Sequence, residues 1–145
     1  MTQRNITEEE LRKLSLEMRY LEQTAETLQQ RISMVNAAIS DLTYANLTLD
    51  GIEKEKENAE LLVPIGGSAY VKAKLADTNK VIVGLGAGVS IEKTLLEAKT
   101  TLKERLNELE KTMNAAQQQF TQVADRMNKG RSRLETLLAP REGKT

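Results

Sequence analysis

The sequence contains no cysteine and no histidine, and only 3% of its residues are aromatic. These absences remove disulfides, zinc sites of the usual Cys and His type, and most nucleophile–base pairs of enzymes. The scarcity of aromatic side chains predicts a thin hydrophobic core for a chain of 145 residues. We therefore expect a protein that is not an enzyme and that holds no metal and no cofactor.

Neither sign of charge predominates, because 21 Lys and Arg residues balance 21 Asp and Glu residues. Binding to nucleic acid or to an acidic membrane surface relies on a basic excess or a basic face, so both partners are disfavoured. No apolar run reaches the roughly 18 residues of a membrane span. Residues 1–5 are not followed by the apolar stretch of a signal peptide. We expect a cytoplasmic protein.

The glycine-rich segment at residues 83–88, VGLGAG, lacks the spacing of the common nucleotide-binding loops. The dinucleotide pattern G-x-G-x-x-G would need a glycine in place of Val89, and the phosphate loop would need one in place of Glu92. Glycines in such a segment also let packed strands turn and approach one another. We therefore expect no nucleotide site here.

Two long stretches carry apolar residues in alternating steps of three and four. The first follows a capping box at residues 7–10 and runs from Leu11 to Leu49, and the second follows a capping box at residues 94–97 and runs to Leu137. Heptads sustained over this length predict coiled-coil helices. Since the stretches are nearly equal in length, they are expected to pair as an antiparallel hairpin that ends before Pro140.

Asn46 is the one polar residue on the first seam, and two consecutive steps of four before Leu106 insert a stutter in the second. The antiparallel pairing places Asn46 opposite Leu106, and Met18 opposite Leu134. A buried Asn commonly sets helix register and lowers stability, although a tolerated Asn is the alternative.

Residues 60–92 are predicted to form β-structure, because their apolar residues alternate with a period of two. Strands are expected at residues 60–63, 70–75, 80–83 and 89–92. The turn residues 77–79 are expected to join the second and third strands as a hairpin, and glycines punctuate the other connections. Two small hairpins have too little core to be stable alone, so we expect the sheet of another subunit to cover them.

The predicted fold class is α+β, a long antiparallel coiled-coil hairpin with two inserted β-hairpins. Residues 7–59 form the first helix, residues 60–92 form the oligomerisation hairpins and residues 94–139 form the second helix. The residues expected to mediate oligomerisation are apolar strand residues, namely Leu62, Val63, Ile65, Val71, Leu75, Val81, Ile82, Val83, Val89 and Ile91.

The end of the coiled coil away from the hairpins, called the tip below, carries apolar residues off the seam, such as Leu16 and Tyr20. Gly130 is expected to open a hole in the seam that exposes its neighbours. Isolated exposed apolar residues are ordinary, and seam methionines most often only pack, so the gathering at one end is the stronger argument. The candidate client-binding residues are Leu16, Met18, Tyr20, Met127, Leu134, Leu137 and Leu138.

The order of heptad helix, two hairpins and heptad helix resembles the α-class subunit of prefoldin, over nearly the whole chain. The resemblance rests on the phrases LLVPIGGSAYVKAKLADTNKVIVGLGAGVSIEKT and LEAKTTLKERLNELE, and its specific part is the segment from Leu62 to Thr94. The resemblance implies an α2β4 hexamer with an α–α contact, in which the hairpins build a double β-barrel. It further implies that unfolded client proteins are held without ATP at the tips and passed to a cytosolic group II chaperonin.

Two other classes of function stay open at this point. One is a passive structural or tethering coiled coil with an oligomerisation sheet, which would need no apolar tip. The other is a helical arm that binds nucleic acid, as some synthetases append, which the balanced charge disfavours.

Overall fold

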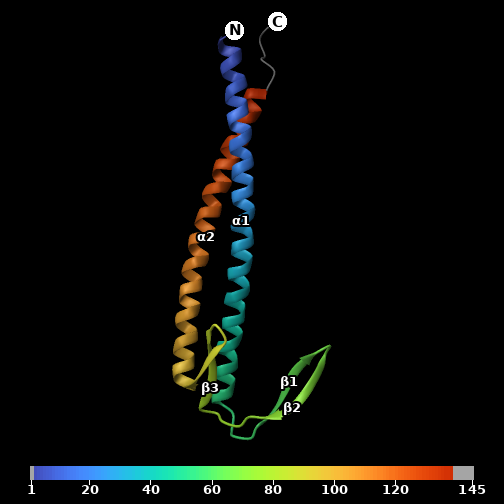
Figure 1. Ribbon diagram of the computed structural model, residues 1–145, viewed down its shortest axis with the longest axis vertical. Coiled ribbons are helices and arrows are strands. Elements are labelled where there is room, and N and C mark those ends of the chain that lie inside the picture. Colours follow the sequence, from blue (N-terminus) through green and yellow to red (C-terminus); the bar gives the residue numbers. More distant parts are fainter. Residues whose placement is uncertain (1, 139–145) are drawn as a thin grey trace. The chain divides into compact units, whose positions relative to one another are not determined.

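The computed structural model describes residues 2–138, and it describes side chains for residues 8–138. Two long helices enclose four strands in the chain order (Figure 1). The elements are α1 (Thr2–Glu53), β1 (Glu60–Gly66), β2 (Ala69–Lys74), β3 (Lys80–Gly86), β4 (Val89–Thr94) and α2 (Leu95–Leu138). The predicted α+β class, with two long helices and two antiparallel hairpins, is confirmed.

The chain divides into two compact units, and each contains a part of α1 and a part of α2. The first unit holds α1 up to Asn36 and α2 from Lys111 onward. The second unit, Ala37–Glu110, holds the adjoining helical parts and both hairpins. Within each unit the two helices lie side by side and run in opposite directions (Figure 1).

Helix α1 begins at Thr2 and ends at Glu53, whereas the sequence predicted a helix over residues 7–59. The chain leaves the helix through tight turns, and Asn58 adopts a left-handed conformation with a φ of 66°. The Asn58 amide donates to the Leu75 carbonyl at 2.7 Å, and the Leu75 amide donates to the Ala59 carbonyl at 2.9 Å. These bonds tie the charged segment after α1 to the end of β2, so the segment cannot continue the helix.

Helix α2 begins at its predicted cap. The Thr94 side-chain oxygen accepts a hydrogen bond from the Glu97 amide at 3.2 Å, which satisfies one of the free amides of the first turn. The side chain of Thr7, in the other predicted capping box, lies outside the described side chains. Residue 139 and Pro140, at the predicted end of this helix, lie outside the described residues.

The strands pair as two separate antiparallel sheets, β1 with β2 and β3 with β4. The predicted hairpin between the strands at 70–75 and 80–83 is therefore wrong. Two-residue turns with positive φ lie at 67–68, between β1 and β2, and at 87–88, between β3 and β4. The backbone twist of such turns matches that of antiparallel strands, so the strands on either side of each turn pair with one another. The turn at residues 77–79, where Asp77 Oδ1 accepts from the Asn79 amide at 2.7 Å, connects the two hairpins instead.

The second hairpin packs on the helices of its own unit. Val83 of β3 lies in a hydrophobic cluster with Leu49 of α1 and with Leu95 and Ala98 of α2. Arg105 of α2 also donates to the Gly84 carbonyl at 2.8 Å. Burial of these apolar side chains and this hydrogen bond hold β3 against the helices.

An ionic cluster joins the end of α1 to the start of α2. The Lys99 ammonium donates to the Glu53 carboxylate and lies 3.0 Å from Asp50 Oδ1. The hydrogen bond that Lys99 donates to Glu53, followed by the one to Asp50, raises the pKa of Lys99 above its usual value. Lys99 therefore stays charged at neutral pH, and the cluster supports the helix pair beside the hairpins.

Candidate functional site

The candidate tip residues fall into two groups. Leu16, Tyr20 and Leu138 lie off the seam and expose 60%, 69% and 65% of their surfaces. The seam residues are more covered, since Met18 is buried and Met127, Leu134 and Leu137 are half-buried. The first group therefore presents most of its surface to other molecules, and the second group presents much less.

Gly130 forms a notch in α2 that is filled by Met18 of α1. A Cβ added at residue 130 would lie 2.5 Å from the Met18 sulfur and 3.6 Å from Leu14 Cδ1. The expected hole at Gly130 is therefore occupied by Met18, and the notch lies one helical turn from Leu134, the predicted partner. An unbranched thioether adapts well to such an irregular gap, which explains the pairing.

Most of the predicted oligomerisation residues are uncovered in the single chain. Leu62, Val63, Ile65, Val71, Ile82, Val89 and Ile91 are exposed. Leu75 and Val81 are half-buried, and Val83 lies in the core of its own chain. Tyr70 and Leu85 belong to the same exposed set, which the sequence reasoning missed although both lie in the apolar strand segments.

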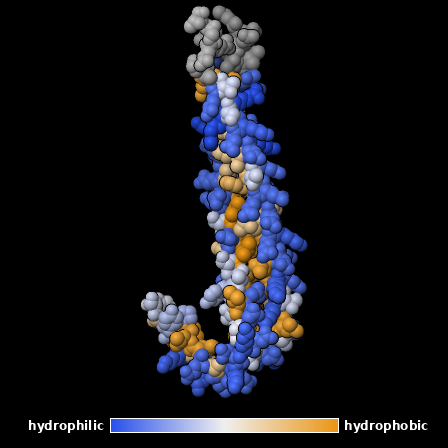
Figure 2. Space-filling model, turned by 180° about the vertical axis from the view of Figure 1, so that it is seen from behind, coloured by the Kyte–Doolittle hydropathy of each residue, from blue (hydrophilic) through white to orange (hydrophobic). Residues whose placement is uncertain are grey.

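The two hairpins differ in what they present to solvent. In the first, the pair Val63 and Val71 lies on one face and the pair Pro64 and Tyr70 on the other. Figure 2 shows hydrophobic residues of this hairpin open at the surface. In the second hairpin one face packs on the helices, and Ile82 on the opposite face is 76% exposed. Both faces of the first hairpin therefore lack an apolar cover within the described chain.

Four further apolar side chains on the helices are exposed and were not predicted. They could have been predicted from the sequence, because they lie outside the three-and-four spacing of the buried seam. They are Met34, Tyr44, Leu47 and Leu96.

The described residues contain no group of three or more acidic side chains that could hold a metal ion. Within the same part of the chain, neither helix has a stretch apolar enough to cross a bilayer.

Asn46 lies on the seam of the second unit with an unsatisfied side-chain oxygen. Its Oδ1 atom is buried and receives no hydrogen bond from the described part of the protein. A buried polar atom in this state destabilises a fold by roughly 1–3 kcal/mol. The unsatisfied oxygen agrees with the prediction that a buried Asn46 lowers the stability of the helix pair.

The variant Asn46→Leu is expected to raise the free energy of unfolding by about 1 kcal/mol, because it replaces an unsatisfied amide with an apolar side chain. Thermal unfolding followed by circular dichroism measures the change. Asn36→Leu, at an exposed position of α1, is the matched control and should have little effect. A lower melting temperature for Asn46→Leu with unchanged assembly would mean that the amide stabilises the helix pair.

Comparison with known proteins places this arrangement in one family. The family model for prefoldin subunits matches residues 21–139. The prefoldin subunit alpha of Methanococcoides burtonii is 36% identical over 83% of this chain and 88% of its own length. That of Methanosarcina barkeri is 33% identical over 93% of this chain and 96% of its own.

Solved structures agree on the fold. A chain of the filamentous prefoldin from Methanocaldococcus jannaschii superposes with a TM-score of 0.69 at 23% identity, covering 79% of this chain and 95% of that chain. The prefoldin beta subunit of Thermococcus strain KS-1 superposes with a TM-score of 0.62 at 17% identity, covering 91% and 95%. With a match over most of its length, the chain belongs to the prefoldin subunit family, a family of chaperones and not of enzymes.

Proposed function

We propose that this chain is the α-class subunit of an ATP-independent holdase that captures unfolded proteins at its tips and delivers them to a group II chaperonin in the cytoplasm. The observation that carries the proposal is the first hairpin, whose faces both carry exposed apolar side chains. Such a hairpin is not stable alone in water and needs further strands or a helix to pack against it. Assembly with other subunits would cover these apolar faces, which explains why they are exposed in the single chain.

The assembly is an α2β4 hexamer with an α–α contact, in which hairpins from all subunits close an intersubunit β-barrel. The β1–β2 and β3–β4 sheets have two strands each, so every strand has an edge free of partners within the sheet. Closure into a barrel removes such edges. The relatives named prefoldin subunit alpha support the α class for this chain.

Client capture is assigned to Leu16, Tyr20 and Leu138, which are exposed in the first unit. Met18, Met127, Leu134 and Leu137 contribute when a client separates the helices locally. Each tip binds weakly through burial of apolar surface, and several tips held by one barrel bind a chain with avidity. This mechanism uses no nucleotide, no cofactor and no catalytic residue.

The experiment combines the purified chain with a β-class prefoldin subunit and measures the mass of the product by light scattering. The product is then added, without ATP, to a chemically denatured test protein during dilution. We expect a hexamer that suppresses aggregation at stoichiometric amounts. A hexamer that leaves aggregation unchanged would favour the passive tethering function.

A further inference from the structure

A hollow of about 410 Å³ lies between α1 and α2 in the first unit, beside Gly130. This volume falls in the range of sites that hold small ligands or side chains, roughly 300–1,000 Å³. Leu14 and Gly130 supply its uncharged lining. Gly130 contributes only backbone to this lining, because Met18 occupies the space where a side chain of residue 130 would lie.

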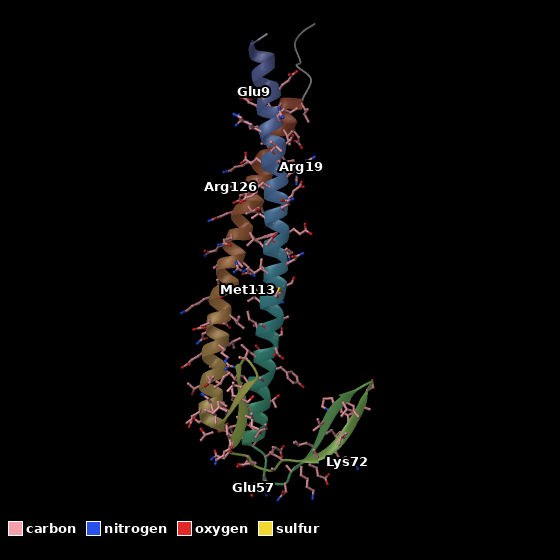
Figure 3. All side chains as sticks on the ribbon, viewed as in Figure 1. Glu9, Arg19, Glu57, Lys72, Met113 and Arg126 are labelled. Carbon is pink, nitrogen blue, oxygen red and sulfur yellow. The ribbon has the colours of Figure 1, made fainter. Side chains whose placement is uncertain are left out.

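The rim of the hollow carries more positive than negative charge. Four cationic residues line it, Lys13 from α1 and Arg126, Lys129 and Arg133 from α2, against the two carboxylates of Glu10 and Glu17. Figure 3 shows Arg126 on α2 in this part of the molecule. The local excess is two positive charges, by four minus two, whereas the whole chain has a net charge of zero.

Most of these cations are free to meet an external partner. Arg133 approaches Glu10 at 3.9 Å, which is a loose ion pair between exposed side chains. Lys13, Arg126 and Lys129 form no ion pair with any residue that the structure describes. An anionic group that enters the rim therefore gains attraction without breaking an internal salt bridge.

We propose that this hollow is a subsite for client segments in which an apolar side chain is flanked by Asp or Glu. The apolar side chain lies against Leu14 and Gly130, and the flanking carboxylates meet Arg126, Lys129 and Lys13. This inference rests on the proposed function, and it adds a preference among clients that burial of apolar surface alone does not supply. Capture by this subunit then favours acidic unfolded segments over basic ones.

The test uses the full-length chain assembled with β-class subunits and three fluorescent peptides. The peptides share a leucine-containing centre and differ only in flanking Asp, Ser or Lys residues. Fluorescence anisotropy at low salt should show the Asp-flanked peptide binding about tenfold more tightly than the Lys-flanked one, as expected for two or three exposed charge pairs. The difference should shrink as salt screens the charges.

The double variant Arg126→Glu, Lys129→Glu should reverse this preference. The matched control is Lys111→Glu, Arg131→Glu, because it makes the same charge change on the same helix at exposed residues that do not line the hollow. The control should keep the preference. Circular dichroism establishes that both variants stay helical.

Equal binding of the three peptides to the unmodified assembly would overturn the charge preference, and so would equal effects of the two double variants. If the assembly binds none of the peptides but still suppresses aggregation of a denatured protein, the subsite proposal is overturned and the holdase function stands. If the unmodified assembly neither binds the peptides nor suppresses aggregation, both the proposed function and the subsite are overturned.

Discussion

Deletion of residues 61–91, with a short loop joining the helices, is expected to abolish the oligomer and leave a helical monomer. The exposed apolar strand residues of both hairpins are removed by this change, whereas Leu28, Met113 and Ala116 still bury the seam of the first unit. Light scattering measures the mass and circular dichroism the helix content. Assembly of the truncated chain at the mass of the full one would show that the hairpins do not mediate oligomerisation.

A point substitution separates assembly from folding. Ile82→Asp is expected to weaken assembly and leave the helicity of the isolated chain unchanged, because Ile82 is exposed in the single chain and becomes buried in the proposed barrel. Burial of an unpaired carboxylate there would cost several kcal/mol. Leu96→Asp is the matched control, since Leu96 is 74% exposed on α2 outside the hairpins and its replacement should leave assembly intact.

Truncation to residues 22–130 is expected to leave the oligomer intact and to reduce strongly the ATP-independent protection of a denatured client. The cut removes Leu16, Tyr20 and Leu138, the exposed residues of the tip, and leaves both hairpins untouched. Avidity depends on several weak sites acting together, so the loss of all tips of this subunit reduces binding far more than additively. Suppression of aggregation, followed by light scattering, is the measurement.

A milder version avoids any loss of helix length. The triple variant Leu16→Ser, Tyr20→Ser, Leu138→Ser changes only exposed side chains and should reduce protection, whereas Met34→Ser, at a residue 74% exposed in the same unit, should not. Protection by the truncated assembly at the level of the full one would move client capture to the hairpins or to the rest of the helices. A full assembly that never protects would favour the tethering function.

Periodicity in the sequence was sufficient to predict the element types. Steps of three and four predicted two long helices, and alternation with glycine punctuation predicted four strands, because each secondary structure repeats its buried side at its own period. The cap at Thr94 was also predictable, since its hydrogen bond joins residues three apart in the chain. These features depend on local geometry alone.

The burial of individual residues was decided by the tertiary structure. The alternation of apolar residues places Ile82 and Val83 on opposite faces of the strand, but it does not indicate which face packs on a helix. In the structure Val83 packs with Leu49 and Ala98 and is buried, whereas Ile82 is exposed. The fit of Met18 into the notch at Gly130 depends in the same way on two residues far apart in the sequence. Contacts between distant segments arise from the shapes that meet in three dimensions, and the spacing of apolar residues along one chain carries no information on those shapes.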